Sequence, residues 1–383
     1  MRIAQVAPLY ERVPPLYYGG TERIVSYLSE ELINQGHEVT LFASGDSLTR
    51  GQLIAPCKRS LRLDSDCDTP LVYHLLQLDQ VCQNAASFDI IHFHIDYLHF
   101  PFLRRLGRPH VTTLHGRLDL PDLVRLYEQF NNVPVVSISN SQRRPLPSIN
   151  WQGTVYHGIP SDLYDLKSSH GTYLAFLGRI SPEKRVDRAI EIAKRANIKL
   201  KIAAKVDPVD KHYMDTKIRP LLDHPLIEFI GEIGEKEKPE FLGKAFALLF
   251  PIDWVEPFGL VLIEAMACGT PTIAFRRGSV PEIIDSGITG FVVETIEESL
   301  SALDQIPRFD RALCRKVFDE RFSAKRMVSD YLRTYQKLID RKYRSPPVLI
   351  DAKEKTRPQP APSANPEAVA IIPLQTKPES PDS

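Results

Sequence analysis

Short apolar runs alternate with amphipathic segments along most of the chain, and this alternation restricts the fold more than any other feature. Apolar runs of about 4–8 residues are typical of buried strands, and apolar side chains at helical spacing are typical of helices. In the first half, strands are predicted at 3–7, 38–43, 89–93, 111–114 and 133–138, and helices at 21–35, 71–86 and 120–130. Strands joined through helices need right-handed crossovers, which build a parallel sheet covered on both faces.

The pattern begins again after residue 158. Strands are predicted at 173–177, 200–204, 227–230, 247–251, 272–275 and 290–293, and helices at 186–196, near 239–245 and from 259. A chain of 383 residues is also longer than one hydrophobic core usually serves. The sequence therefore predicts an α/β protein of two Rossmann-like, doubly wound domains, residues 1–157 and 158–325, joined near residues 156–160.

Two further segments follow the second predicted domain. Residues 327–342 have the apolar spacing of an amphipathic helix, and we expect the segment 326–343 to pack back on the N-terminal domain. Residues 344–383 are rich in proline, alanine and charge. Because such a segment cannot bury enough apolar surface to fold alone, it is predicted to be a disordered tail.

Charge and cysteine content exclude some classes of protein. Lys and Arg number 48, as do Asp and Glu, so no net charge favours nucleic acid as a partner. Five cysteines without a Cys-x-x-Cys pair indicate free thiols in a reducing compartment. The N-terminus has no signal-peptide core, and no apolar run approaches the roughly 18 residues of a membrane span. We therefore expect a cytoplasmic protein, with peripheral membrane contact left open.

The stretch from Glu256 to Gly269 carries glutamates on both sides of an apolar run. Because Pro257 holds Glu256 in an extended conformation, a helix should begin near Gly259, and its apolar character all round predicts burial. The N-terminus of such a helix binds anions. Two interpretations stay open. Either Glu264 pairs with a buried arginine while Glu256 lies on the surface, or both carboxylates bind hydroxyl groups on either side of a phosphate, as a nucleotide sugar requires.

Two other strand-to-helix turns suit the phosphates of the same ligand. Arg179 and Lys184 follow the first strand of the second half in the sequence Gly-Arg-Ile-Ser-Pro-Glu-Lys, and such cations bind a diphosphate. Gly19 and Gly20 precede the first helix, where adjacent glycines let the backbone approach a ligand closely. The alternatives are solvated surface cations for the first turn and an ordinary tight loop for the second.

Histidines follow two predicted strands of the first half. His115 comes directly after the strand 111–114, so it should lie at a carboxyl strand end, where open α/β sheets bind ligands. Three more histidines surround Asp96: His92, His94 and His99. A metal site is one interpretation of this group. Because an acidic cluster is missing, packing or acceptor contacts are the preferred one.

These motifs together resemble the retaining glycosyltransferases of family 4, which have the GT-B fold of two Rossmann-like domains facing a central cleft. Glu256 and Glu264 match the Glu-x7-Glu element of that family, and the Pro-Phe-Gly-Leu that follows Glu256 matches its usual filling. Segments 278–282 and 290–293 look like its next elements, and the resemblance covers residues 1–342. One departure is His157-Gly-Ile-Pro160, where the family often has Asn-Gly-Ile-Asp, and it leaves the hinge geometry open.

The resemblance implies a role for each matching residue. Glu256 would contact the donor sugar and Glu264 the ribose, while backbone N–H groups after Phe258 would hold the diphosphate. The remaining matches are those N–H groups at Gly259, Leu260 and Val261, the diphosphate clamp Arg179 and Lys184, the glycine loop Gly19 and Gly20, the sugar-binding histidine His115, and a weaker match at the base-reading turn, Glu232 and Ile233.

The resemblance predicts transfer of a hexose from a nucleotide-diphosphate sugar to an acceptor hydroxyl, with the anomeric configuration retained. UDP- or GDP-hexose is the expected donor, and a saccharide, a lipid or a small metabolite is the expected acceptor, read by loops 8–20, 44–70 and 94–102 with Asp96 as a candidate contact. His115, Glu256, Arg179 and Lys184 are the predicted catalytic residues, with no metal and no cofactor. Two alternatives stay open: a sugar-nucleotide epimerase of the same fold, and a protein that binds nucleotide sugars without catalysis.

Overall fold

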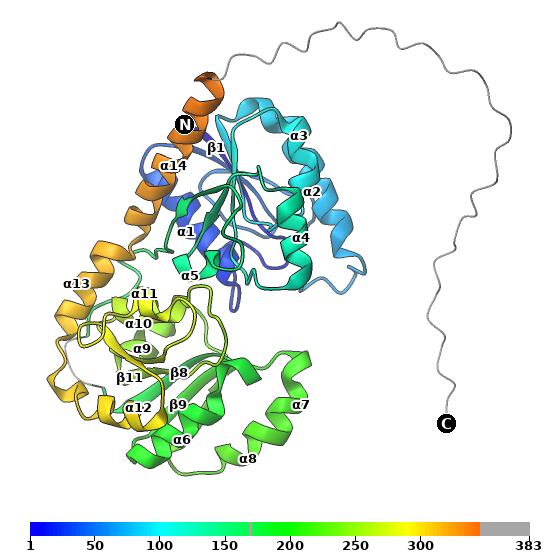
Figure 1. Ribbon diagram of the computed structural model, residues 1–383. Helices are drawn as coiled ribbons and strands as arrows, with labels where there is room; N and C mark the ends of the chain where they lie inside the picture. Colours follow the sequence, from blue (N-terminus) through cyan, green and yellow to red (C-terminus); the bar gives the residue numbers. More distant parts are fainter. Residues whose placement is uncertain (168–170, 345–383) are drawn as a thin grey trace, which may run out of the picture. The chain divides into compact units, whose positions relative to one another are not determined.

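The computed structural model describes residues 1–167 and 171–344, in which strands and helices alternate as the sequence predicts (Figure 1). The strands form two sheets, and the neighbouring strands of each sheet run parallel. The segment 344–383, predicted to be a tail, lies outside the described residues except for its first residue.

Seven strands form the first sheet, in the order β3-β2-β1-β4-β5-β6-β7. They are β1 (Arg2–Val6), β2 (Glu38–Phe42), β3 (Gln52–Ile54), β4 (Ile90–Phe93), β5 (His110–Thr113), β6 (Val135–Ser137) and β7 (Trp151–Thr154). The helices between them are α1 (Gly20–Asn34), α2 (Pro70–Asn84), α3 (Leu103–Leu106), α4 (Pro121–Gln129) and α5 (Asn140–Arg143). We call this sheet and its helices the first lobe.

Six strands form the second sheet, in the order β10-β9-β8-β11-β12-β13. They are β8 (Tyr173–Arg179), β9 (Leu200–Lys205), β10 (Ile227–Gly231), β11 (Ala245–Phe250), β12 (Thr272–Phe275) and β13 (Gly290–Val293). The helices are α6 (Val186–Ala196), α7 (Lys211–Tyr213), α8 (Arg219–Leu222), α9 (Lys238–Gly243), α10 (Leu260–Ala267), α11 (Val280–Ile283), α12 (Ile296–Leu303) and α13 (Arg311–Arg321). This is the second lobe.

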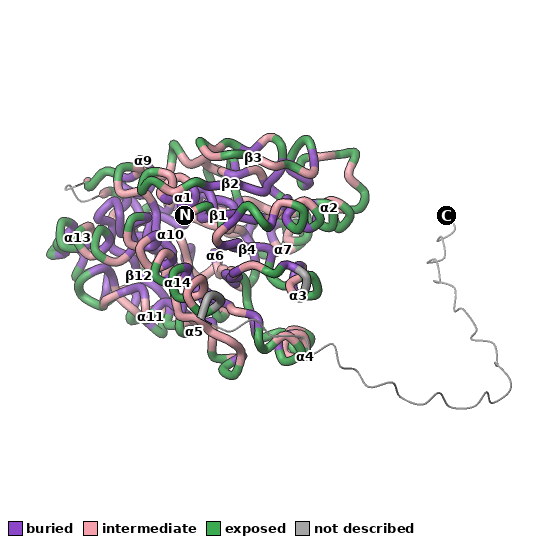
Figure 2. Tube along the Cα trace, turned by 90° about the horizontal axis from the view of Figure 1, so that it is seen from above, coloured by how far each residue is buried: buried purple, intermediate pink, exposed green. Residues whose placement is uncertain are grey.

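Burial explains why the central strands could be predicted from the sequence and two edge strands could not. The helices that were not predicted are α3, α5, α7, α8, α11, α12 and α13. The central strands consist almost wholly of buried residues, while exposed residues follow the outer faces of helices such as α2 and α4 (Figure 2). β3 and β7 were not predicted, because they are edge strands of three and four residues in which no residue is fully buried. A strand without a buried face shows no apolar run.

The last helix, α14 (Ala324–Arg344), completes the core of the first lobe although it follows the second lobe in the chain (Figure 1). Met327, Val328, Tyr331 and Tyr335 are fully buried in one cluster with apolar side chains of β1 and α1, among them Ile3. Burying side chains of this size stabilises a fold by about 2 kcal/mol each. The first lobe is therefore built from two separate parts of the chain.

The two chain segments that connect the lobes lie side by side. The Ile159 N–H donates to the carbonyl of Phe322 at 3.0 Å, and the Ala324 N–H donates to the carbonyl of Ile159 at 2.8 Å. A Cβ on Gly158 would lie 2.3 Å from the carbonyl oxygen of Ser323. The departure at residues 157–160 thus retains a glycine where the close approach of the second segment leaves no room for a side chain.

Candidate active site

The carboxyl ends of strands from both lobes surround one cavity of about 530 Å³, which we call the main cavity. His115 follows β5, Arg179 ends β8, and Glu256 lies in the loop after β11. Parallel α/β sheets bind ligands at this end because loops diverge there and helices begin there. The predicted residues that line the main cavity are Gly19, Gly20, His115, Arg179, Lys184, Glu256, Phe258, Gly259, Leu260 and Val261.

A second cavity of about 150 Å³ adjoins the main one, and we call it the side cavity. Gly19, Gly20, Leu260 and Val261 line both cavities. The remaining predicted residues, Glu232, Ile233 and Glu264, line the side cavity. The two cavities are therefore neighbours, and the start of α10 and the glycine loop are common to their linings.

α10 begins directly after Gly259, as the sequence predicts, and its first two residues line both cavities. Gly259 precedes the helix with a φ of 87°, and no side chain caps the first turn. A helix leaves its first N–H groups without intrahelical partners and concentrates positive potential there. Leu262 to Ala267 are buried, so the helix is held rigidly by packing. The arrangement can bind an anionic group between the two cavities.

Glu256 is buried beside this helix start, with 7% of its surface exposed, so the interpretation that places it on the surface is wrong. Its Oε2 accepts hydrogen bonds from Lys184 Nζ at 2.6 Å and from Trp254 Nε1 at 3.0 Å. A Cβ on Gly278, whose φ is 55°, would lie 2.2 Å from the carbonyl oxygen of Glu256. The segment 278–282 matched to the family thus holds the backbone of Glu256 in place.

Glu264 is paired with a lysine and not with the arginine that one interpretation expected. Its Oε1 accepts from Lys238 Nζ at 2.7 Å, and the same ammonium lies 3.4 Å from Glu235. Glu235 also forms an ion pair with Arg23 of the first lobe and accepts from the Tyr27 hydroxyl at 3.0 Å. Glu264 and these partners come from three separate segments of the chain, and no spacing in the sequence indicates that they meet.

Both cations of the Gly-Arg-x4-Lys turn already have carboxylate partners. Arg179 forms ion pairs with Glu183 and, at 3.4 Å, with Asp207. Lys184 bonds Glu256 and lies 4.9 Å from the ring centre of Trp254. The interpretation of these residues as free surface cations is therefore wrong, since both line the main cavity and are largely covered.

His115 is oriented by a chain of hydrogen bonds that begins in the core of the first lobe. Gln5 Oε1 lies 2.8 Å from His94 Nε2, and His94 Nδ1 lies 2.9 Å from His115 Nε2. The Gln5 amide nitrogen in turn donates to the Tyr335 hydroxyl of α14 at 3.2 Å. We call these three contacts the His115 relay.

The His115 relay determines which ring nitrogen of His115 carries the proton. A carbonyl oxygen only accepts, so His94 Nε2 donates to Gln5 and leaves His94 Nδ1 as an acceptor. His115 Nε2 must then be the donor, and His115 Nδ1 becomes an acceptor that has no partner among the residues described. Burial lowers the pKa of His115 to about 3, so the ring is neutral at physiological pH.

His157 lies beside His115. The sequence predicts no site role for it, because it belongs to the segment 157–160 that departs from the family pattern. The two rings stack with centres 5.2 Å apart, and the ring of Phe258 lies edge-on to His157 at 4.8 Å. His157 is buried, lines the main cavity, and has a pKa held well below its usual range by burial. It is a neutral ring packed between two predicted site residues.

The group around Asp96 does not contribute to either cavity. Asp96 is exposed and lines neither the main nor the side cavity. His92 bonds the Tyr335 hydroxyl at 2.6 Å and Thr113 at 2.7 Å, and His99 bonds Thr112 at 2.7 Å. These bonds fit the packing interpretation. Within residues 1–167 and 171–344, no group of three His, Cys, Asp or Glu side chains is arranged to hold a metal ion.

Two family models match the chain in adjacent parts. Residues 18–148 match the model of Glycosyltransferase Family 4, and residues 166–306 match the model of Glycosyl transferases group 1. The first match covers the glycine loop and His115. The second covers the segment from before β8 to α12, with both glutamates and both cations.

Curated relatives are similar at low identity. An N-acetyl-alpha-D-glucosaminyl L-malate synthase of Bacillus anthracis is 25% identical over 377 residues, which cover 84% of this chain and 94% of the relative. An uncharacterized glycosyltransferase of Methanocaldococcus jannaschii is 26% identical over 279 residues, covering 67% and 77%. A D-inositol 3-phosphate glycosyltransferase of Mycobacterium sp. is 32% identical over 136 residues, covering 32% and 29%.

Solved structures with the same architecture extend over most of the chain. A sucrose-phosphate synthase from Thermosynechococcus elongatus has a TM-score of 0.72 at 18% identity, covering 89% of this chain and 100% of its own. Anabaena HepE, in complex with UDP and glucose, has a TM-score of 0.70 at 17% identity, covering 88% and 100%. At these identities the likeness concerns the fold alone.

Proposed function

The chain belongs to the group 1 glycosyltransferases and has the GT-B fold, and we propose that it transfers a hexose from a nucleotide-diphosphate sugar to an acceptor hydroxyl with retention of the anomeric configuration. One observation carries this proposal. Of the two glutamates of the Glu-x7-Glu element, Glu256 lines the main cavity and Glu264 lines the side cavity, and the first residues of α10 line both.

We place the nucleoside in the side cavity, where Glu264 would accept hydrogen bonds from the ribose hydroxyls and Glu232 and Ile233 would contact the base. The diphosphate would meet the first N–H groups of α10. The hexose would then extend into the main cavity toward Glu256 and His115. A UDP- or GDP-hexose fits this layout, and UDP is the nucleotide bound by HepE, which shares the fold.

The chemistry assigned to the site is stabilisation of a leaving diphosphate. Charge develops on that group as the glycosidic bond breaks, and Arg179, Lys184 and the α10 start supply fixed positive potential toward it. Because these groups supply the positive potential that a metal ion would otherwise provide, we propose catalysis without a metal ion. The acceptor hydroxyl attacks from the face that the diphosphate leaves and passes its proton to a phosphate oxygen, which accounts for retention.

Glu256 and His115 would orient the hexose. Glu256 keeps one carboxylate oxygen engaged with Lys184 and Trp254, and its other oxygen can accept from a sugar hydroxyl. His115 Nδ1 can accept from a second hydroxyl, because the His115 relay leaves it unprotonated. Ion pairs between the lobes, such as Arg23 with Glu235, would favour closure that excludes water from the donor.

We propose a saccharide, a lipid or a small metabolite as the acceptor, and the cytoplasm as the compartment. The relatives' names contain malate in one case and inositol 3-phosphate in another, so the family leaves the acceptor open. Among the described residues, no helix has both the length and the apolar character that crossing a bilayer demands. The five cysteines are all free thiols, which fits the reducing conditions of a cytoplasm.

A thermal-shift screen tests the proposal directly. UDP, GDP and ADP, free and as glucose, mannose, galactose and N-acetylglucosamine conjugates, are added to the full-length chain. A ligand at about 100 times its Kd adds roughly 2.7 kcal/mol of stability. We expect a shift with one nucleotide series that Glu264→Ala removes and that Glu320→Ala, an exposed change on α13, leaves intact.

The same screen separates the two rival functions. No shift with any nucleotide would contradict the assignment of the cavities to a nucleotide sugar. A shift accompanied by conversion of the donor into a rearranged sugar, without any acceptor, would indicate an epimerase. A shift without transfer, hydrolysis or rearrangement would indicate a protein that only binds the nucleotide sugar.

A further inference from the structure

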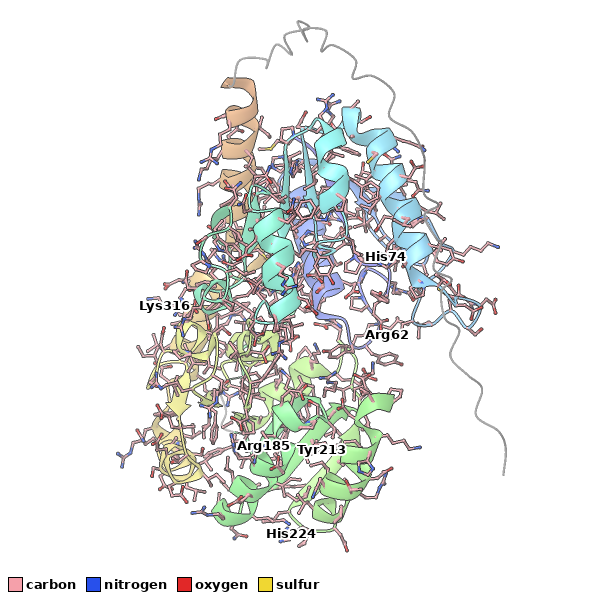
Figure 3. The ribbon with its side chains drawn as sticks, turned by 45° about the vertical axis from the view of Figure 1, so that its right-hand side comes forward. Arg62, His74, Arg185, Tyr213, His224 and Lys316 are labelled. Carbon is pink, nitrogen blue, oxygen red and sulfur yellow. The ribbon has the colours of Figure 1, made fainter. Side chains whose placement is uncertain are left out.

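One wall of the main cavity carries no residue that the proposed donor uses. It is formed by side chains of the loop before α1, of the first turn of α1 and of the loop after β3, and we call it the first-lobe wall. Its members are Tyr10, Glu11, Tyr18, Glu22 and Arg62. Figure 3 shows Arg62 where the first lobe faces the second.

The charges on the first-lobe wall are unequally matched. Arg62 is paired with Glu11, the nitrogen and oxygen lying 2.8 Å apart. Glu22 forms no ion pair with any side chain in the part of the chain that the structure describes. The other two cations that line the main cavity, Arg179 and Lys184, do not belong to this wall and are assigned to the diphosphate of the donor. The wall thus offers one unmatched carboxyl group and no unmatched cation.

Glu22 is placed to contact a ligand and not solvent. Only 6% of its surface is exposed, yet it lines the main cavity from the first turn of α1. Burial raises its pKa to about 7, while the backbone N–H groups of Glu22 and Glu11 favour the charged form. A buried carboxylate that no cation balances is costly, and a ligand that donates further hydrogen bonds to it, or carries positive charge, lowers that cost.

Two aromatic rings stand exposed on the same wall. Tyr10 is 44% exposed and Tyr18 is 46% exposed, and both line the main cavity. Exposed aromatic rings at the mouth of a cavity stack on flat faces of ligands, including the C–H faces of sugar rings. The first-lobe wall therefore combines stacking surfaces with a hydrogen-bond acceptor.

We propose that the first-lobe wall binds the acceptor, and that it selects a ring-bearing, hydroxylated acceptor that is uncharged or cationic over one that carries a phosphate or a carboxylate. This inference rests on the proposed function. A phosphate or carboxylate placed against Glu22 would find a like charge and no free cation. Like-charge contacts inside a site are strongly unfavourable, and we expect discrimination on the order of tenfold to a hundredfold.

The test uses the full-length chain at about pH 8, where Glu22 is ionised, with the nucleotide sugar that gives the thermal shift. The sugar is radiolabelled, and a bacterial small-molecule extract, separated by ion exchange into anionic, neutral and cationic fractions, supplies the acceptors. Labelled product is measured for each fraction. We expect product from the neutral or the cationic fraction to exceed that from the anionic fraction at least about tenfold.

Two variants of the wall and one control sharpen the result. Glu22→Gln keeps the shape and removes the charge, so the preference against anionic acceptors should fall several-fold. Arg62→Gln, a change at a half-exposed side chain, removes the cation that pairs with the Glu11 carboxylate and should strengthen that preference. Glu31→Gln makes the same charge change elsewhere on α1, where Glu31 bonds Gln35, and should change nothing.

Product mainly from the anionic fraction, or an unchanged preference in both Glu22→Gln and Arg62→Gln, would overturn the inference. So would the absence of product from every fraction when the donor binds, because the extract contains both favoured classes. Failure of every nucleotide sugar to bind would instead count against the proposed function.

Discussion

Lys184 Nζ lies 2.6 Å from Glu256 Oε2, although the lysine is assigned to the leaving diphosphate and the glutamate to the donor sugar. If both proposed assignments hold, the two groups meet where the bond between sugar and diphosphate breaks. Each holds the other in place inside a largely covered site, so a change to one alters both the geometry and the charge of its partner.

Lys184→Ala should separate catalysis from binding. We expect turnover to fall about 10²–10³-fold, because one fixed charge toward the diphosphate is lost, and donor Kd to rise less than tenfold. Because Glu256 is left buried without its cation, the free energy of unfolding should also fall, by about 1–3 kcal/mol. Steady-state kinetics, donor titration and denaturant unfolding measure the three quantities.

The double variant Lys184→Ala with Glu256→Gln is the matched control. It removes the unpaired charge, so stability should recover while turnover stays low. Turnover equal to that of the parent chain in Lys184→Ala would contradict the role given to the lysine.

Glu264 should read the ribose of the donor. We expect a donor that lacks the 2′- or the 3′-hydroxyl to bind the parent chain about 10–100-fold more weakly, since the Glu264 carboxylate loses a charged hydrogen bond. In Glu264→Gln that loss should shrink to a few-fold. Isothermal titration of the four combinations gives the coupling between carboxylate and hydroxyl. Equal losses in both chains would place the ribose elsewhere.

Gln5→Leu should change the protonated nitrogen of His115 from a distance. Without the Gln5 carbonyl, His94 is free to donate through Nδ1, and His115 would then carry its proton on Nδ1 and lose its free acceptor. We expect turnover to fall about tenfold, the value of one hydrogen bond to the sugar. Nitrogen NMR of labelled histidines distinguishes the two forms directly.

Tyr331→Phe provides the control for this change. Tyr331 belongs to the same buried cluster but bonds Thr113 at 2.9 Å and takes no part in the His115 relay. It should lose stability without altering the His115 tautomer. The pKa of His115 is held at about 3. The activity of the parent chain and of Tyr331→Phe should therefore show no change due to His115 titration between about pH 5 and 8. A parent chain with His115 protonated on Nδ1 would contradict the relay.

Glu22 should make the protein less stable as pH rises. Its pKa is raised from 4.5 to about 7, so between these values the folded chain holds a proton that the unfolded chain has released. Stability due to this group is full below about pH 4.5 and is lost as pH rises through 7, by about 3 kcal/mol at most.

Melting temperatures of the parent chain and of Glu22→Gln at about pH 5 and pH 8 measure this effect. The amide does not titrate, so the variant should gain in Tm relative to the parent at the higher pH. Parallel changes of Tm with pH in the two chains would show that Glu22 is not held in its neutral form.

The fold was predictable where the chain buries whole runs of side chains. β8, α6 and β9 lie where apolar periodicity places them, with boundaries shifted by at most a few residues. β7 was missed, because its residues are half-buried at a sheet edge and alternate no more clearly than a loop does. The early start of α14 was missed because Ala324 pairs with Ile159, a contact that local sequence does not encode.

The site was predictable where its residues share one stretch of chain. Glu256 precedes α10, Gly259 stands at its start and Glu264 lies inside it, so the sequence predicts where the helix begins, whereas the spacing alone left two interpretations of the carboxylates open. The partners that tune them come from distant segments: Lys238 for Glu264, and His94 for His115. Such pairs form because loops from different strands converge in the folded structure. Residue spacing within one segment does not predict which distant residues will meet.

The paired connection between the lobes limits how this enzyme could be recombined with others. A fragment ending at residue 157 would lack α14, and with it Met327, Val328, Tyr331 and Tyr335, which fill the interior of the first lobe. An exchange of donor specificity by grafting would therefore need two cuts, one at each strand of the Ile159–Ser323 bridge, so that the graft enters as an insertion. In modular terms, the second lobe is a cassette inserted into the first, and not its successor.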